Sequence, residues 1–519
     1  MTFIHSSEPA RRGVKTAATA LTLAALAFLS GCADMSGIDS QARMRDAASL
    51  GLQDASAAPA STARVSDIAT AEIDAQWWRA YGDPQLDALV EQALQGNPSL
   101  GTARARLAKA QSAIDVAHSA SLPQVNADLG VTRQKFSENY TVPEPLAGAV
   151  INSGSLTLDA GWELDFFGKN RAAVAAAVGA SNAAQAEEQA ARILLSSRVT
   201  SAYIAWARLE SLQGVARRTL AQREETFKLV RDRVSAGLDT RLELRQSEAG
   251  LPEARQRIEE LDEQIAIAHH ALDALVAQPN ATSRLQAPQL DKLSVPAMPA
   301  HLPADLLGHR ADVVAARWRV EAATQDVSYA KKQFYPNIDL VGSIGYQALG
   351  VDKLLNISSF MWSVGPAVKL PIFEGGRLRA NLRGKNADLD AAVESYNGTV
   401  IDAIRDVADQ VASVKSVARQ QVQQREGQQA AEGAYDIALQ RYRAGLGTYL
   451  DVLTAENSVL AQRRDQVNLA ARALSTQAQL AQALGGGYRP QEDAAASAGA
   501  APAANTQAHA ASAAATVQR

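Results

Sequence analysis

The sequence contains few of the features that usually stabilise a protein or hold it in a membrane. Cys32 is the single cysteine among 519 residues, so no disulfide can form within the chain. Aromatic residues make up 5% of the chain. After residue 31, no apolar run reaches the roughly 18 residues that a membrane helix needs. The fold must therefore be stabilised by packing alone, without disulfides, and any crossing of a membrane must be made by strands.

The sequence also lacks patterns that would indicate nucleic-acid binding, catalysis or metal binding. The formal net charge is −4, and no block of basic residues stands out. The seven histidines are scattered, and a helix would point the adjacent His269 and His270 about 100° apart. Neither a glycine-rich phosphate loop nor a Gly-x-Ser-x-Gly elbow is present. We therefore expect a protein that is not an enzyme, without a cofactor, metal ion or nucleic-acid partner.

The N-terminal residues have the order of a secretory signal. Basic residues precede an apolar run over 17–29, which is too short to span a bilayer. The run ends in Leu29-Ser30-Gly31-Cys32, a segment that resembles a bacterial lipobox. A lipobox implies that residues 1–31 are a removed signal peptide, that Cys32 is lipidated, and that an N-terminal segment over 32–75 is anchored to a membrane. An ordinary signal followed by a chance cysteine is the alternative.

Two halves of the sequence repeat each other. Four short segments recur in the same order, 206 to 213 positions later. They are 103–106 with 316–319, 122–125 with 335–338, 164–171 with 370–377, and 233–240 with 441–448. We therefore expect two repeats, over 76–285 and 286–488. The remaining residues, 489–519, are rich in alanine and are expected to form a disordered tail, because they cannot bury a core.

Each repeat contains a pair of segments in which apolar and polar residues alternate. The predicted strands are 123–134, 154–167, 336–347 and 360–373. In the second of them, Leu156 and Trp162 fall on one face, and Asp159 and Glu163 on the other. This pattern is typical of a barrel strand with lipid outside and water inside; a soluble sheet on a core is the alternative. Four strands cannot close a barrel, so the chain must oligomerise.

Long stretches without proline follow each strand pair. They predict helices over 171–236 and 377–444, the first of up to 66 residues or about 99 Å, a length typical of coiled-coil staves. Glycine-containing turns end both helices. We expect return helices over 240–278 and 448–484, the first kinked or broken by Pro252. A further helix is predicted over 304–333.

These residues together resemble the TolC-like outer-membrane factors, and among them the NodT family of efflux lipoproteins. The resemblance covers about 32–488. It rests on Trp77-Trp78 followed by Asp83-Pro84, on the Arg-Tyr-Arg-Ala-Gly segment at 441–445, and on Leu484-Gly485-Gly486-Gly487-Tyr488. It implies an α+β membrane protein: a homotrimer whose twelve-stranded barrel, four strands per chain, continues as a long α-helical coiled-coil tunnel in the periplasm.

The resemblance also implies a function and partners. The trimer would be the outer-membrane exit channel of a tripartite efflux system for small molecules or drugs. It would dock on a periplasmic adaptor (a membrane fusion protein) and on an inner-membrane RND-type pump. An exit duct for type I protein secretion is the alternative. A periplasmic adaptor would instead have one hairpin between lipoyl-like and β-barrel halves, and a structural coiled coil would lack the strand pairs.

Positions matched to the family one by one imply a closed gate near the far end of the long helices. Leu450 would form an apolar constriction and Asp451 a ring of negative charge in the lumen. Thr454 stands where relatives often carry a second acid. The Tyr442 hydroxyl would hold the gate closed by donating a hydrogen bond to Glu243. The alternative is that Asp451 merely begins a helix.

The two glycine turns would form the adaptor-docking tip. Their small residues would let an adaptor hairpin approach the backbone closely. The tip residues are Ala236, Gly237, Leu238, Ala444, Gly445 and Leu446. The alternative is that the glycines only cap their helices, because capping alone explains glycine at such positions.

Overall fold

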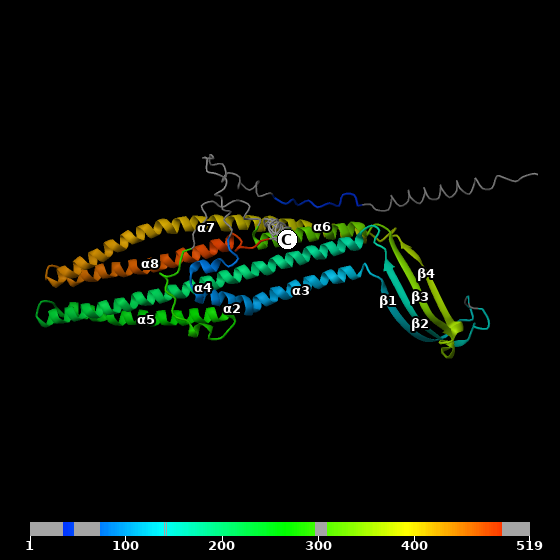
Figure 1. The fold of residues 1–519 in the computed structure, drawn as a ribbon, viewed down its shortest axis with the longest axis horizontal. Helices are drawn as coiled ribbons and strands as arrows, with labels where there is room; N and C mark the ends of the chain where they lie inside the picture. The colour runs from blue at the N-terminus through cyan, green and yellow to red at the C-terminus, as the bar shows by residue number, and fades with distance from the viewer. Residues whose placement is uncertain (1–34, 46–72, 140, 142, 296–308, 490–519) are drawn as a thin grey trace, which may run out of the picture. The chain divides into compact units, whose positions relative to one another are not determined.

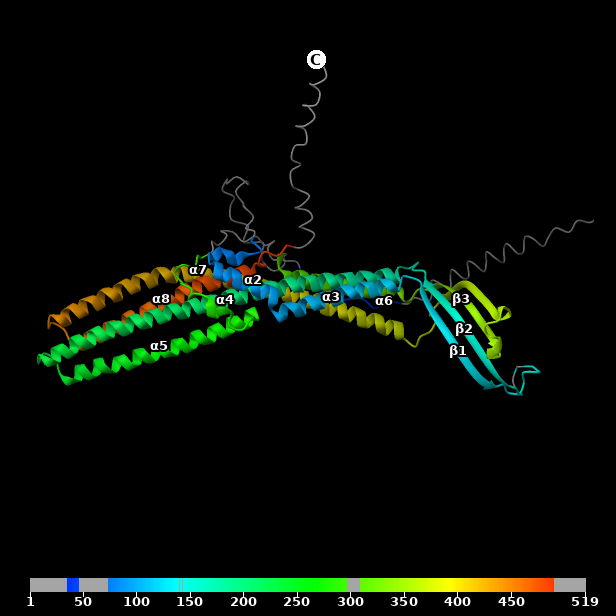
Figure 2. The ribbon, with the colours of Figure 1, turned by 60° about the horizontal axis from the view of Figure 1, so that its bottom comes forward.

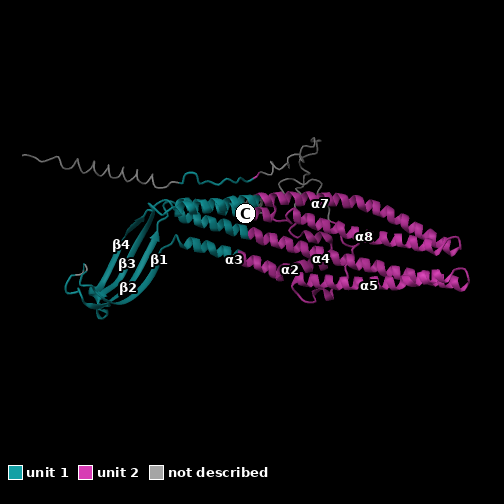
Figure 3. Cartoon of the chain, turned by 180° about the vertical axis from the view of Figure 1, so that it is seen from behind, with its two compact units in different colours: residues 1–44, 107–184, 316–396 teal, residues 45–106, 185–315, 397–519 magenta. Residues whose placement is uncertain are grey.

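The computed structural model describes residues 35–45, 73–139, 141, 143–295 and 309–489 (Figure 1). The predicted signal peptide over 1–31, the lipidation site Cys32, most of the segment 32–75, residues 304–308 of a predicted helix and nearly all of the tail 489–519 lie outside these residues. The chain divides into two compact units (Figure 3). Unit 1 comprises Met1–Met44, Leu107–Ala184 and Ala316–Tyr396, and unit 2 comprises Arg45–Arg106, Gln185–Ala315 and Asn397–Arg519.

Unit 1 contains one antiparallel sheet of four strands in sequential order, as Figures 1 and 2 show. The strands are β1 (Gln124–Lys135), β2 (Val150–Glu163), β3 (Asn337–Leu349) and β4 (Phe360–Lys369). Each repeat therefore supplies one hairpin, and the two hairpins join through β2 and β3. The outer strands β1 and β4 each pair with one neighbour within this sheet.

The register of the sheet separates its two faces. One row across the strands is apolar, and the next row is polar. The apolar row is Ala127, Leu158, Ile344 and Trp362, and the polar row is Asn126, Asp159, Ser343 and Ser363. The large apolar side chains of the first row are exposed in the single chain. Alternation with period two thus gives a sheet whose apolar face is left uncovered.

The strand β2 ends earlier than the predicted segment 154–167. After Glu163 the chain turns, and the Asp165 carboxylate accepts backbone N–H bonds from Asn170 at 3.1 Å and Arg171 at 3.0 Å. These bonds satisfy free N–H groups in the first turn of the next helix. The strand therefore gives way to a helix start that hydrophobic alternation alone does not reveal. β4 likewise ends at Lys369 rather than 373.

Two helical hairpins continue the two repeats. The first pairs α4 (Lys169–Ser235) with α5 (Arg241–Val276), and the second pairs α7 (Arg377–Arg443) with α8 (Tyr449–Ala483), as Figures 1 and 2 show. Pro252 lies inside α5, which continues through it, so a break of this helix, one of the two predicted outcomes, is wrong. In the described part of the chain, no helix combines the length and apolar character needed to cross a membrane.

Shorter elements complete the described fold. The helices α2 (Pro84–Gly96) and α3 (Pro98–Ser119) precede the sheet, and α6 (Ala311–Lys332) precedes β3. Four 3-10 turns are η4 (Trp77–Tyr81), η5 (Ala281–Arg284), η7 (Val351–Lys353) and η8 (Ile357–Ser359).

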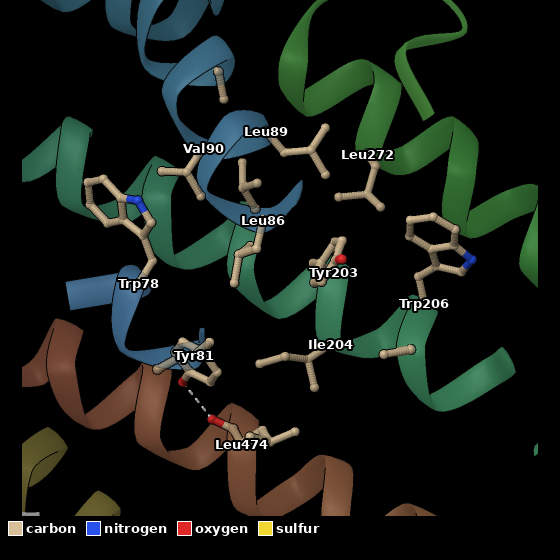
Figure 4. Close-up of a cluster of buried hydrophobic side chains, with 14 of the residues drawn as sticks. Trp78, Tyr81, Leu86, Leu89, Val90, Tyr203, Ile204, Trp206, Leu272 and Leu474 are labelled. Carbon is tan, nitrogen blue, oxygen red and sulfur yellow. Dashed lines mark hydrogen bonds between the residues drawn. The ribbon is translucent and has the colours of Figure 1, made fainter. Parts of the chain in front are cut away.

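The largest apolar core of the described residues lies in unit 2 and gathers several elements around the Trp77-Trp78 motif (Figure 4). The buried Tyr81 donates its hydroxyl hydrogen to the carbonyl of Leu474 on α8 at 2.9 Å. Tyr203 of α4 donates to the Asp83 carboxylate at 2.6 Å. Asp83 also caps α2 by accepting from Gln85 N–H. The motif therefore ties η4 and α2 to both hairpins.

The three glycines after α8 are required by close approach as well as by conformation. Gly486 and Gly487 have φ of 53° and 78°. A Cβ atom on Gly486 would lie 2.7 Å from Ile193, and one on Gly487 would lie 2.5 Å from the backbone nitrogen of Ala75. Any other residue would be both strained and crowded here. This explains the closing Gly-Gly-Gly segment of the second repeat.

Candidate gate and docking tip

The two hairpin turns have the same backbone structure. In the first, Leu238 N–H donates to Arg233 C=O at 2.9 Å, and Gly237 N–H donates to Val234 C=O at 3.0 Å. In the second, Leu446 donates to Arg441 at 2.8 Å and Gly445 to Tyr442 at 3.0 Å. This is the Schellman arrangement, which closes a helix with a left-handed residue. Gly237 and Gly445 accordingly have φ of 74° and 73°.

The tips are open to solvent. Leu238 is 65% exposed and Leu446 is 70% exposed. A Cβ atom built on Gly237 or Gly445 would meet nothing within 4 Å. Glycine is therefore required by the backbone angle and not by crowding. The open space leaves both the capping role and close approach by a partner possible for these residues.

Each return helix begins with a capping box. Thr240 accepts from Leu242 N–H, and the Glu243 carboxylate accepts from Thr240 N–H at 2.9 Å. In the second repeat, Thr448 accepts from Asp451 N–H at 3.3 Å, and Asp451 accepts from Thr448 N–H at 2.9 Å. These bonds satisfy free donors at the helix starts. Glu243 and Asp451 are thus equivalent capping residues of the two repeats.

The capping bonds change the acidity of both carboxyl groups. The hydroxyl of Thr240 is the main cause that lowers the pKa of Glu243 below its ordinary value. The backbone N–H and hydroxyl of Thr448 lower the pKa of Asp451 in the same way. Hydrogen bonds to the charged form stabilise it. Both groups are therefore anionic at neutral pH.

The predicted hydrogen bond between Tyr442 and Glu243 is wrong. The Tyr442 hydroxyl donates to the Asp239 carboxylate instead. Glu243 is engaged in its own capping box with Thr240. Asp239 comes just before that box, in the turn itself, and the buried Tyr442 ring, 1% exposed, points at it. The inter-repeat bond therefore exists, but with a different acceptor.

An arginine completes this link. Arg233 Nε lies 2.9 Å and Nη2 3.3 Å from the two Asp239 oxygens, and the guanidinium lies 4.6 Å from the centre of the Tyr442 ring. A bidentate pair of this kind combines charge with fixed geometry. We call Arg233, Asp239 and Tyr442 the gate link, because they tie the α4–α5 turn to α7 of the other hairpin.

The gate link shifts the acidity of its members. Burial raises the pKa of Asp239, but the hydrogen bonds from Arg233 and Tyr442 outweigh it, so the pKa lies below its ordinary value. Burial and the neighbouring Asp239 raise the pKa of the Tyr442 hydroxyl. The link is therefore an anion held by a cation and a neutral hydroxyl over the whole physiological range of pH.

The remaining predicted gate residues are exposed in the single chain. Leu450 is solvent-exposed at the start of α8. Thr454 is also exposed, and its hydroxyl donates to the Leu450 carbonyl at 2.8 Å. Asp451 lies between them in sequence and is exposed too. The structure thus places these three residues on one helix turn, separate from the buried gate link.

Sequence comparison of the repeats contained a signal for the residues that were missed. Arg233 and Asp239 lie in the repeated segment 233–240, where Arg441 and Gly447 are their counterparts. A carboxylate in one repeat and a glycine in the other mark an asymmetric position. The described residues also contain no group of three or more histidine, cysteine or acidic side chains that could hold a metal ion.

Comparison with known proteins decides the family. The model of the outer membrane efflux protein family matches residues 89–278 and 302–486. The chain belongs to this family. The two matched segments fall one in each repeat, so the duplication found in the sequence is covered by the family match.

Characterised relatives and solved structures are similar over most of the chain. Fusaric acid resistance protein FusA of Burkholderia cepacia is 38% identical over 384 residues, which is 73% of this chain and 70% of FusA. Multidrug resistance outer membrane protein MdtP of Shigella flexneri is 32% identical, covering 80% and 87%. The outer membrane protein VceC of Vibrio cholerae has a TM-score of 0.76 and 39% identity, covering 80% of this chain and 100% of VceC.

The outer-membrane channel OprN has the same TM-score of 0.76, with 27% identity, and covers 87% of this chain. These likenesses confirm the predicted fold class, in which each chain contributes four barrel strands and long helices. The chain is a TolC-like outer-membrane efflux channel protein that extends into the periplasm.

Proposed function

We propose that three copies of this chain form the exit duct of a tripartite efflux system. The observation that carries the proposal is the four-stranded sheet with an uncovered apolar face and two outer strands, β1 and β4, that each pair on one side only. In lipid, free strand edges leave polar backbone groups unpaired, so the sheet must close on itself. Three chains give twelve strands, an even number within the range of such barrels.

The trimer is tested by its behaviour in outer-membrane fractions. We expect a species of three chains that survives mild detergent and dissociates on heating. Trp162→Arg, on the apolar face one residue from the end of β2, should reduce this species, since a lipid-facing cation costs about 2–4 kcal/mol at the bilayer midplane and about 1 kcal/mol or less near an interface. Glu163→Arg, on the polar face, is the matched control. A stable monomer, or greater damage from Glu163→Arg, would contradict the proposal.

Small molecules are the proposed cargo. FusA carries fusaric acid resistance in its name, and MdtP carries multidrug resistance. Both names describe resistance to small compounds. Deleting the gene should lower the minimal inhibitory concentration of fusaric acid or other drugs, and the intact gene should restore it. Unchanged drug sensitivity together with loss of a secreted protein would support the alternative, a type I secretion duct.

A periplasmic adaptor and an inner-membrane RND-type pump are the proposed partners, docked at the two exposed turns. Leu238 and Leu446 offer apolar side chains beside open glycine backbone. Leu238→Glu or Leu446→Glu should abolish drug efflux while trimer levels stay normal. Efflux that remains unchanged would leave the glycines with a capping role alone. Crosslinking from the same positions would identify the adaptor.

The membrane anchor and the gate complete the proposal. Cys32, outside the described residues, would carry palmitate. Cys32→Ser should lose the label of radioactive palmitate, and equal labelling of both proteins would contradict lipidation at this residue.

In the trimer, Leu450 would form an apolar constriction and Asp451 an acidic ring. The gate link of Arg233, Asp239 and Tyr442 supports this closed state, because like charges held together repel and need restraint.

A further inference from the structure

The seam between the two hairpins contains a buried charge. On α8, Tyr449, Val452, Glu456 and Val459 are all buried and recur at spacings of three and four residues, so they share one face. The apolar members pack in a cluster with Val230 of α4 and with Tyr442 of the gate link. Glu456 is 5% exposed and stands between two apolar layers of this face.

The partner of Glu456 comes from the other hairpin. Arg223 of α4 donates from Nη1 to the Gly250 carbonyl at 2.9 Å and to the Glu253 carboxylate at 2.8 Å, both on α5. Its Nε lies 3.5 Å from Oε2 of Glu456. One guanidinium is thus fixed within the first hairpin and presents its remaining side to the second.

The pair constrains position more than it stabilises the fold. In the part of the chain that the structure describes, Oε1 of Glu456 and Nε of Arg223 have no hydrogen-bond partner. The two side chains are 7% and 11% exposed. A buried pair with incomplete hydrogen bonding contributes little net stability, but separating it leaves uncompensated buried charges. A slip of α8 along α4 by one turn, about 5.4 Å, would do so.

We propose that Arg223 and Glu456 form a latch, distinct from the gate link. This latch fixes the α7–α8 hairpin against the α4–α5 hairpin and resists opening of the gate. The latch rests on the proposed efflux-channel function and adds positioning residues to it. It acts through α8, the helix that carries Leu450 and Asp451. The gate link joins the α4–α5 turn to α7, and the latch joins α4 to α8 further along the helices.

The latch predicts a response to pH. The charged and titratable groups around Glu456 are Arg223 on α4, Glu253 on α5, Tyr435 on α7 and Tyr449 on α8. Burial raises the pKa of Glu456 above its ordinary value, and Arg223 opposes this only in part. A pocket of about 430 Å³ is lined by Arg223 and Glu253, but not by Glu456.

The sign of the response follows from linkage. If opening separates Glu456 from Arg223 while Glu456 stays buried, the open state loses the interaction that favours the ionised carboxylate. The open state then binds the proton more tightly than the closed state does. Lowering the pH through the raised pKa of Glu456 should therefore favour the open state.

Resting conductance in planar bilayers, measured against pH with the full-length channel, tests the latch. Arg223→Gln removes the pair, so open-state occupancy at neutral pH should rise about tenfold. Glu456→Gln removes both the pair and its titratable group, so occupancy should also rise and its pH profile should be flat. Arg223→Gln combined with Glu456→Gln should be no more open than either single variant, because each of them has already lost the pair.

Two controls separate the possible failures. Arg463→Gln breaks the 3.1 Å pair of Arg463 with Glu432 inside the α7–α8 hairpin and should leave conductance unchanged. Tyr442→Phe breaks the gate link and should raise conductance. If Tyr442→Phe acts but Arg223→Gln does not, the latch is wrong and the channel function stands. If wild-type protein forms no channel, the proposed function fails, and the latch with it.

Glu456→Gln keeps the inference testable if Arg223→Gln does not assemble. A flat pH profile for assembled Glu456→Gln channels would support the latch. A profile identical to that of the wild type would overturn it.

Discussion

The two hairpin turns have the same backbone and different side chains. Gly237 and Gly445 have φ within one degree of each other, and the same pair of hydrogen bonds closes both turns. Two residues later, the first turn has Asp239 and the second turn has Gly447 at the corresponding position. The carboxylate receives Arg233 and Tyr442, whereas glycine offers no side chain. The repeated scaffold is symmetric, and the link between hairpins is not.

The largest difference between the turns should appear when each arginine is removed. Arg233→Leu leaves the Asp239 carboxylate, 11% exposed, without its cation. We expect the free energy of unfolding to fall by about 3 kcal/mol. Arg441→Leu, the matched change, removes an exposed side chain bonded to the Leu446 carbonyl and should cost less than about 0.5 kcal/mol. Denaturant unfolding in detergent measures both, and equal losses would contradict the asymmetry.

Asp239 gives the first turn a pH dependence in addition to that of the capping carboxylates Glu243 and Asp451, whose pKa values are lowered in both repeats. The folded-state pKa of Asp239 is lowered, so its contribution to stability is complete above the ordinary aspartate pKa. It is lost as the pH falls through the lowered folded-state value. Asp239→Asn should remove this acid-dependent component of unfolding, and Gly447→Ala should not. A wild-type acid profile in Asp239→Asn would show that another group is responsible.

The turn glycines should be equally sensitive, because only their backbone angle matters. Gly237→Val and Gly445→Val each force a β-branched residue to positive φ, which costs about 2 kcal/mol. Nothing within 4 Å would obstruct the new Cβ atom in either turn, so the two losses should agree. Thermal unfolding of the two variants measures this. A clear difference between them would mean that contacts, rather than conformation, select glycine at one turn.

The capping threonines should give a smaller and again equal effect. Thr240→Ala and Thr448→Ala each remove a side-chain acceptor at the start of a return helix. A lost cap costs about 1 kcal/mol. Serine replacements at the same positions retain the acceptor and are the matched controls. Unfolding curves that differ between the two alanine variants would break the symmetry of the scaffold.

The smallest structural effect with a distinct functional outcome should come from the capping carboxylates. Asp451→Asn and Glu243→Gln both keep an acceptor oxygen for the cap. Asp451 is the residue proposed to face the lumen, so only Asp451→Asn should weaken cation preference. Reversal potentials in asymmetric salt measure this. Equal shifts of the reversal potential in both variants would contradict the placement of Asp451, and not Glu243, in the conducting path.

The sequence predicted most of the scaffold, because repetition and periodicity are properties of the chain itself. The alternation around Leu156 and Asp159 gave the correct faces of β2, and the glycine at 237 marked the end of α4 within two residues. The C-terminal limit of β2 could not be read from the pattern, because Asp165 begins the next helix by hydrogen bonds to backbone N–H groups further along.

The details of the site were harder to predict. Tyr442 was correctly expected to join the repeats, but its acceptor is Asp239 and not Glu243. The capping box had already engaged Glu243, and capping is a local effect that competes with long-range bonds. Arg223 and Glu456 are far apart in sequence and lie on helices of different repeats. Only the packing of four helices brings such residues together.

The central claim is that the gate link in one turn holds the closed state of an outer-membrane efflux channel. Single-channel conductance in planar bilayers tests it most directly, with Tyr442→Phe and Asp239→Asn compared with Arg441→Gln in the other turn. We predict a higher resting conductance for the first two variants and wild-type conductance for the third. Wild-type conductance in both link variants, or an equal rise in Arg441→Gln, would contradict the claim.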